Sequence, residues 1–153
     1  MRGSVTPDDP FEAFVDLWRE LRADSAEPGT VILVEGERDR RALRRLGIPG
    51  PVVAVHRGQS LAGSAQALVG SSRRVILLTD WDTEGGHFAQ RFRDLLSAEP
   101  ARLDLEYRRR LARILRGELV HVEGLHGWAR RQAERRRRSL ETLVDGDEPR
   151  ATG

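Results

Sequence analysis

The chain contains no cysteine, and this absence sets the first limit on its chemistry. Disulfides, zinc sites built on thiolates and cysteine nucleophiles are excluded, so any metal ion must be bound by oxygen or imidazole ligands. Lysine is also absent, and all 26 basic residues are therefore arginine. Arginine favours planar, bidentate contact with phosphate, but GC-rich coding explains the lack of lysine better. That lack is weak evidence for a ligand.

Long apolar runs are missing as well. No segment approaches the roughly 20 apolar residues that a membrane-spanning helix needs. The acidic residues Asp8 and Asp9, soon after Met1, are atypical of a signal peptide. We therefore expect a soluble, cytoplasmic protein. With 153 residues and 39% hydrophobic side chains, the chain can bury the core of one ordinary domain.

Three short apolar runs alternate with segments that have apolar residues at helical spacing. The runs are rich in β-branched residues and predict strands buried on both faces of a sheet; they lie at 31–34, 52–55 and 75–78. The helical spacing occurs at about 37–46, 61–68 and 88–96. Such alternation predicts right-handed crossovers and a mostly parallel sheet flanked by helices. The predicted fold class is therefore α/β, with a Rossmann-like sheet.

Helical additions are expected at both ends of this sheet. Residues 10–23 have the apolar spacing of one helical face. Beyond Pro100 the pattern is less clear, with a helix around 111–115 and a possible fourth strand at 119–122. The expected organisation is an N-terminal helix and linker at 1–29, an α/β domain at 30–125, an arginine-rich C-terminal helix at 126–144 and a flexible tail at 145–153.

Acidic residues follow two of the predicted strands. Glu35 comes directly after the first strand, and Asp80 and Asp82 follow the third. Open parallel sheets bind ligands at the carboxyl ends of their strands, where the strand order reverses. If the strand order is 2-1-3-4, the first and third strands are neighbours and the three carboxylates face one another. A divalent cation such as Mg²⁺ would relieve their repulsion and leave positions for phosphate oxygens.

Other interpretations of the second acidic segment compete with a metal site. An aspartate after a strand often caps the next helix. The spacing Asp80-x-Asp82-x-Glu84-Gly85 also copies the start of an EF-hand calcium loop, but the twelfth position is Arg91 and a strand precedes the motif. Haloacid-dehalogenase phosphatases carry Asp-x-Asp-x-Thr after an apolar strand, whereas Glu84 stands in the threonine position here. A small-molecule phosphatase therefore stays open as an alternative.

Two motifs together resemble the Toprim domain. They are Val31-Ile-Leu-Val-Glu35-Gly36-Glu-Arg-Asp39 and Val75-Ile-Leu-Leu-Thr-Asp80-Trp-Asp82-Thr-Glu-Gly85. Toprim domains occur in type IA and type II topoisomerases, bacterial-type primases, ribosomal-RNA maturase nucleases and old-family nucleases. The Glu-Gly-x-x-Asp form is most similar to the primase and maturase branches. The overall length and the loop at 56–60 are most similar to small stand-alone Toprim proteins, which are common in archaea.

The resemblance covers roughly residues 31–123 and implies roles for the carboxylates. Asp80 and Asp82 would bind Mg²⁺ or Mn²⁺, while Glu35 would act as general acid or base or join the metal ligands. Asp39 would lie one helical turn from Glu35, where it would bind a second metal, support the first, or be a surface charge. The implied activity is phosphoryl transfer on RNA or DNA, with a nuclease as the leading interpretation. The alternative from another class is a non-catalytic nucleic-acid or ribosome-associated binding module.

The remaining candidates are arginines, histidines and one further glutamate. Arginines expected to contact nucleic-acid phosphates are Arg38, Arg57, Arg108, Arg109 and Arg135. The run 135–138 fits a solvated helix equally well. Glu123 would end the fourth strand on the same rim as the cluster, and His56 and His87 could line the site, although a lone histidine more often lies on the surface. The expected partner is nucleic acid, with a homodimer or a larger nucleic-acid-processing complex as an option.

Overall fold

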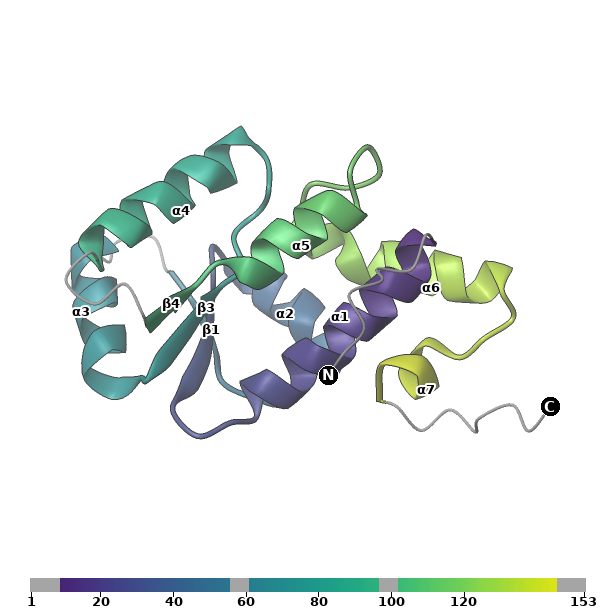
Figure 1. Ribbon diagram of the computed structural model, residues 1–153, viewed down its shortest axis with the longest axis horizontal. Coiled ribbons are helices and arrows are strands. Elements are labelled where there is room, and N and C mark those ends of the chain that lie inside the picture. The colour runs from purple at the N-terminus through teal and green to yellow at the C-terminus, as the bar shows by residue number, and fades with distance from the viewer. Residues whose placement is uncertain (1–8, 56–60, 97–101, 146–153) are drawn as a thin grey trace.

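The computed structural model describes residues 9–55, 61–96 and 102–145, which form a parallel sheet between two layers of helices (Figure 1). The sheet has four strands in the order β2-β1-β3-β4, and all three neighbouring pairs are parallel. The strands are β1 (Thr30–Val34), β2 (Val52–Ala54), β3 (Arg74–Leu77) and β4 (Leu103–Asp104). The predicted α/β class and the predicted adjacency of the first and third strands are confirmed.

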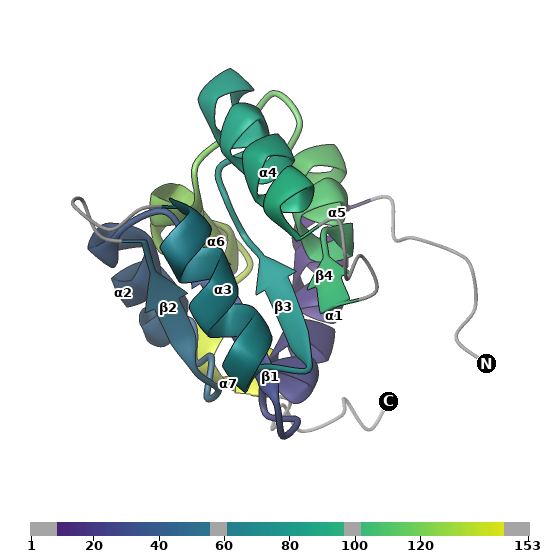
Figure 2. The same ribbon diagram turned by 90° about the vertical axis from the view of Figure 1, so that its left-hand side faces the viewer.

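Helices cover both faces of this sheet (Figures 1 and 2). One face is covered by α3 (Leu61–Ser71) and α4 (Thr83–Leu95). The other face carries α1 (Pro10–Ser25), α2 (Glu37–Arg45), α5 (Glu106–Ile114), the short 3-10 helix η2 (Val122–Gly124), α6 (Leu125–Arg135) and α7 (Leu140–Asp145). Within the described ranges, no helix has the length and apolar character needed to cross a membrane.

The central strands supply both hydrophobic cores, which explains their unbroken apolar sequence. In β1, Val31 and Leu33 pack with α3 and α4, while Ile32 and Val34 face the larger core under α1 and α6. All five β1 residues are buried. A strand covered on both faces needs no polar alternation, so the sequence pattern and the observed layers agree.

The fourth strand is not where the sequence predicts it. Residues 119–122 form no strand, although His121 has the extended backbone of one, with φ −120° and ψ 135°. Their backbone bonds instead to the loop after β3: Leu119 accepts the Trp81 indole N–H at 2.6 Å, and Val120 accepts the Trp81 backbone N–H at 3.0 Å. The sheet is completed by the two-residue β4, which is too short to give an apolar pattern.

The single C-terminal helix predicted at 126–144 is also wrong, because the structure divides it into α6 and α7. The break lies at Arg137, whose φ of 53° is left-handed. The backbone N–H groups of Arg137 and Arg138 donate to the carbonyl oxygens of Glu134 and Ala133 in the last turn of α6, as in a Schellman C-cap. A glycine usually takes this position, so an arginine there gives no stop signal in the sequence.

Arginines beside this break fasten it to the N-terminal helix. Arg136 pairs with Asp9 at 2.8 Å, and Arg138 pairs with Glu12 at 2.5 Å. The Arg136 guanidinium also lies over the ring of Phe11, 4.7 Å from its centroid. These contacts bind the two helical additions to each other, and they explain why the arginine run at 135–138 is only partly a solvated surface.

Candidate metal centre

Glu35 and Asp80 meet at the carboxyl ends of β1 and β3. Glu35 follows β1 directly, and its Oε2 accepts a hydrogen bond from the backbone N–H of Asp80 at 3.0 Å. This bond joins the two strand ends at the point where the strand order reverses. The structure therefore brings together the two acidic residues that the strand order was expected to place side by side.

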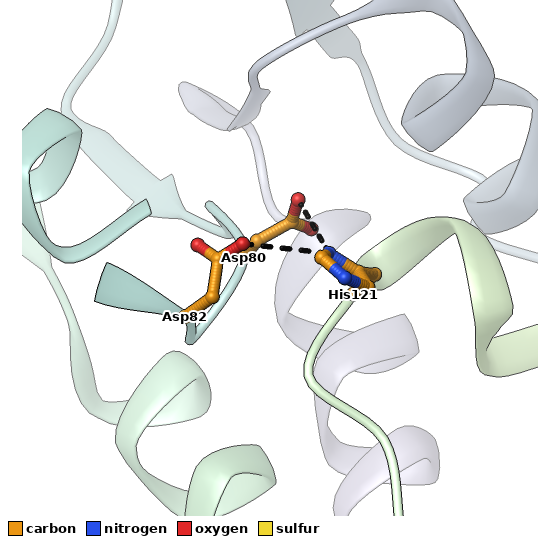
Figure 3. Close-up of side chains that lie close together, drawn as sticks. All are labelled: Asp80, Asp82 and His121. Carbon is orange, nitrogen blue, oxygen red and sulfur yellow. Dashed lines mark hydrogen bonds and ion pairs between the residues drawn. The ribbon is translucent and has the colours of Figure 1, made fainter. Parts of the chain in front are cut away.

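Asp80 is held by the segment that the sequence analysis predicted as a strand. Its Oδ1 accepts the backbone N–H of Val122 at 2.8 Å, and its Oδ2 lies 3.2 Å from Nδ1 of His121 (Figure 3). The Asp80 side chain keeps 21% of its surface exposed. Residues 119–122 thus close one side of the site.

Asp82 caps α4, as one of the competing interpretations predicted. Its Oδ1 accepts the backbone N–H of Gly85 at 2.7 Å, and α4 begins at the next residue, Thr83. The other oxygen, Oδ2, points toward Nδ1 of His121 at 3.6 Å (Figure 3). Capping therefore occupies one oxygen of Asp82 and leaves the second directed at the site.

Gly85 lets the cap and the Asp80 loop approach each other closely. A Cβ atom at this position would lie 1.9 Å from the carbonyl oxygen of Asp80. Under Gly85, the buried Thr79 hydroxyl donates to the Gly85 carbonyl at 3.0 Å. The second motif therefore needs glycine here for steric reasons.

His121 is the site residue that sequence reasoning missed. Its Nδ1 lies near one oxygen of Asp80 and one of Asp82, and its side chain is 54% exposed. The strand interpretation of 119–122 directed attention to Glu123 as the terminal residue of that strand. In the observed loop the residue two positions earlier reaches the carboxylates, and Glu123 instead pairs with Arg38 at 3.7 Å.

Asp39 forms a second group of potential ligands with Glu35 and Asp80. In this group, and in that of Asp80, Asp82 and His121, one ligand atom from each residue lies within 4.8 Å of the others. Asp80 belongs to both groups. Asp39 is only 9% exposed, and its Oδ2 accepts the backbone N–H of Gly36 at 3.1 Å. The predicted set of four carboxylates is thus one continuous cluster.

Burial and repulsion alter the proton affinities in this cluster. Burial raises the pKa of Glu35, and Asp80, Asp39 and Asp82 add to the rise against the opposing hydrogen bond from the Asp80 N–H. Burial, followed by repulsion from Asp80, raises the pKa of Asp39 to about 6. The hydrogen bond to Asp80 raises the pKa of His121. A bound cation would offset the repulsion between the carboxylates.

Arg108, one of the predicted phosphate contacts, supports the Asp80 loop from α5. Its Nε donates to the Thr79 hydroxyl at 2.9 Å, and its Nη2 donates to the Asp80 carbonyl at 2.9 Å. Burial lowers the pKa of this guanidinium, while Glu35, Asp82 and Asp80 oppose the change. Arg108 therefore places one positive charge directly behind the acidic cluster.

The other predicted phosphate contacts that the structure describes are exposed arginines on α2, α5 and α6. Arg38 directly precedes Asp39 in the sequence, and its side chain on α2 is 81% exposed. Arg109, on α5, pairs with Glu106 at 3.8 Å, and Arg135 is exposed at the end of α6. Arg57 lies outside the described residues.

The two histidines named from the sequence add nothing to the cluster in the part of the chain that the structure describes. His87 is exposed on α4 and belongs to neither ligand group. His56 lies outside the described residues.

The donor set of the cluster fits a divalent cation. The Oδ2 atoms of Asp80 and Asp82 converge on one imidazole nitrogen, while both Oδ1 atoms are fixed by backbone N–H groups. Carboxylate oxygens suit Mg²⁺ and Mn²⁺, and an imidazole extends the range toward transition metals. The acidic cluster can therefore hold a metal ion through side chains whose orientations are already set.

Comparisons with known proteins agree with this arrangement. A UPF0292 protein of Thermococcus onnurineus is 36% identical over 118 residues, which cover 76% of this chain and 81% of that protein. A UPF0292 protein of Methanosarcina barkeri is 34% identical over 117 residues, with 76% and 80% covered. A solved structure of a protein from Aquifex aeolicus has a TM-score of 0.59 and 33% identity, and covers 71% of this chain and 94% of its own.

The match to a family covers the sheet and its acidic loops. Residues 30–114 match the Toprim domain, and this range contains Glu35, Asp39, Asp80 and Asp82. His121 lies beyond it. The resemblance seen in the two sequence motifs, including that to small archaeal proteins, is confirmed. The chain belongs to the Toprim domain family.

Proposed function

We propose that this chain is a metal-dependent nuclease that cleaves phosphodiester bonds in RNA or DNA. The observation that carries the proposal is the convergence of one oxygen from Asp80 and one from Asp82 on Nδ1 of His121, beside Glu35. Membership of the Toprim family supports a role with metal and nucleic acid.

Asp80 and Asp82 would hold Mg²⁺ or Mn²⁺, and His121 would become a third ligand once its proton leaves. Such a cation supplies electrostatic stabilisation to the negative charge that develops on the phosphodiester. The protein prepares for this by fixing the carboxylates beforehand: Val122 holds Asp80 and Gly85 holds Asp82 through backbone N–H groups. Little reorganisation would then accompany substrate binding.

Glu35 is the proposed proton-transfer group. Its raised pKa brings its titration closer to neutrality, where a carboxyl group can exchange a proton efficiently. One of its oxygens is occupied by the Asp80 N–H, and this bond fixes the orientation of the side chain. Asp39 lies behind it and would complete a second cation site with Glu35 and Asp80.

The test is a cleavage assay on end-labelled structured RNA, single-stranded DNA and duplex DNA, with Mg²⁺, Mn²⁺ or EDTA. We expect metal-dependent cleavage of at least one substrate and its loss in Asp80→Asn/Asp82→Asn. The matched control is Glu84→Gln, because Glu84 is an exposed carboxylate in the first turn of α4 and belongs to neither ligand group. Absence of cleavage by the wild-type protein on all three substrates would reject the nuclease.

A non-catalytic nucleic-acid-binding module is the second candidate. It is favoured by one observation: Asp80 and Asp82 already have protein partners on both oxygens, so the loops are held without a cation. Nucleic-acid binding that persists in EDTA, without any cleavage, would support this candidate. A small-molecule phosphatase has less support. Asp80 would be the nucleophile of such an enzyme, but both of its oxygens are in contact with Val122 and His121.

A further inference from the structure

The arginines of this protein have two different environments. Many of the partly buried ones join separate elements through carboxylates or backbone carbonyls. Members of this joining group are Arg22, Arg74, Arg110, Arg136 and Arg138. Their guanidinium groups are committed to the fold.

A groove between α2 and α6 collects arginines of the other kind. It has a volume of about 480 Å³ and receives Arg38, Arg41 and Arg45 from α2, with Arg130 and Arg131 from α6. The three residues of α2 follow the i, i+3, i+7 spacing of one helical face. The two helices pack against each other and are seen together in Figure 2. Positive charge therefore lines both walls of the groove.

These groove arginines have weak partners or none among the described residues. Arg41 and Arg130 make only exposed pairs with glutamates on their own helices, at 3.9 and 3.8 Å. Arg45 and Arg131 have no ion pair with any carboxylate in the described ranges. Exposed pairs contribute little to stability, so these guanidinium groups can exchange their present contacts for phosphate at small cost.

The arginines give the groove a positive electrostatic field, which also affects a histidine in its lining. His126 lines the groove, and its pKa is lowered by burial and then by Arg45 and Arg130. Glu123 is the acidic residue in the lining, and its pairing with Arg38 leaves it largely exposed. The field therefore favours an anion.

One end of the groove borders the acidic cluster. Leu119 and Glu123 line the groove and belong to the loop that brings His121 and Val122 to Asp80. Arg38 lies one residue before Asp39 at the start of α2. An anion that is bound along the groove therefore points its end at the proposed metal centre.

We infer that the groove between α2 and α6 binds the sugar-phosphate backbone of a nucleic-acid strand and guides it to the acidic cluster. This inference rests on the proposed function, because the cluster is where the strand would be cut. From Arg38 to Arg45 the helix rises roughly 10 Å, which is long enough to reach more than one phosphate of a strand. Guanidinium groups on both walls can bind these phosphates bidentately.

The lining also predicts how the strand is recognised. None of the described groove residues is Phe, Tyr or Trp, and the aromatic ring in the lining is the imidazole of His126, so the groove offers no large platform for stacking bases. Contacts to phosphate carry no sequence information. Binding in the groove should therefore be sensitive to salt and nearly indifferent to base sequence.

The test compares Arg45→Gln/Arg131→Gln with Arg91→Gln/Arg93→Gln, which removes the same charge from two exposed arginines of α4. Binding of a labelled single-stranded oligonucleotide is measured by fluorescence anisotropy in EDTA over a range of salt concentrations. We expect the groove variant to bind about tenfold more weakly, with the slope of log K against log salt reduced by about 1.4. The α4 variant should keep the wild-type slope. Circular dichroism checks that both variants fold.

Equal binding by the two double variants, whether both are weakened or both unchanged, would overturn the inference. Competition by ATP as strong as that by the oligonucleotide, at equal phosphate concentration, would also overturn it, because a small anion would then suffice. If the groove variant alone lost binding and the wild type cleaved nothing, the nuclease proposal would be rejected, but strand binding in the groove would be supported. If the wild type cleaved nucleic acid and the groove variant bound it normally, the nuclease proposal would be supported and strand binding in the groove would be rejected.

Discussion

Replacement of His121 by alanine tests how the proposed metal centre couples to protons. In the free protein, hydrogen bonding to Asp80 and attraction to Asp80 and Asp82 raise the pKa of His121. A cation that takes Nδ1 as ligand must displace the proton held there. Metal affinity of the wild type should therefore fall as the pH falls below this raised pKa.

The magnitude follows from a count of one proton per metal ion. Below the pKa of His121, the Kd for Mn²⁺ should rise about tenfold for each unit of pH, which is about 1.4 kcal/mol. His121→Ala removes the competing proton and one ligand. We expect it to bind Mn²⁺ more weakly at high pH and to show a much flatter pH dependence than the wild type below the raised pKa of His121.

The assay is isothermal titration calorimetry of Mn²⁺ in two buffers that differ in ionisation enthalpy, because the difference gives the number of protons released. His87→Ala is the matched control, since His87 is an exposed histidine outside both ligand groups. Proton release that is the same in His121→Ala and in the wild type would refute this reasoning. The protons would then come from other groups, with Glu35 and Asp39 the first candidates.

Three further predictions concern the carboxylates, the glycine and an ion pair of the fold. Because the pKa of Asp39 is raised to about 6, wild-type stability should fall as pH rises from about 4 to about 6. Asp39→Asn should reduce that fall, to which Glu35 also contributes, and be more stable by about 3 kcal/mol in urea unfolding at pH 7.5 in EDTA. Gly85→Ala should cost at least about 2 kcal/mol and weaken Mn²⁺ binding, because its Cβ would clash with a backbone carbonyl at 1.9 Å, whereas Gly86→Ala, whose Cβ meets only Arg108 at 3.6 Å, should not. Arg136 lowers the pKa of Asp9, so the stability from this pair is present above the unfolded pKa of Asp9 and lost in acid. Arg136→Ala should therefore cost about 1 kcal/mol more at pH 7 than near pH 2, where the contact of Arg136 with the Phe11 ring remains.

The central sheet and its acidic edge could be predicted because short stretches of sequence indicate both of them. After one polar first residue, β1 and β3 are unbroken apolar runs, as expected of strands buried on both faces. The adjacency of Glu35 and Asp80 then follows from the strand order 2-1-3-4, which the sequence analysis assumed and the structure shows. The cap at Asp82 is equally local, since its partner is the N–H three residues later.

Features fixed by distant contacts could not be predicted in the same way. β4 is held beside β3 partly by the ion pair between Arg74 and Asp104, 30 residues apart, and has no apolar pattern. The segment 119–122 has the sequence of a strand, but Trp81 donates hydrogen bonds to the carbonyl groups of Leu119 and Val120. Because the sequence does not record this docking, the place of His121 beside the carboxylates was missed.

The part of the chain that matches the Toprim domain contains the carboxylates of the candidate site but not all of its residues. The carboxylates lie within residues 30–114, the part that matches the Toprim domain, whereas His121 and the α6 wall of the groove follow it. The α6 wall packs on the N-terminal helix: Phe14 of α1 stacks on Trp18 at 5.2 Å and meets Trp128 of α6 edge-on at 5.4 Å.

The helical additions are therefore part of the candidate site, not a separate appendage. Trp18 donates its indole N–H to the Leu46 carbonyl just after α2, at 2.8 Å, so α1 contacts the first wall of the groove as well as the second. Loosening α1 would move both walls, while the Glu35–Asp80 hydrogen bond belongs to the sheet and would stay in place. Changes in the α1 core should consequently impair strand binding before they impair metal binding.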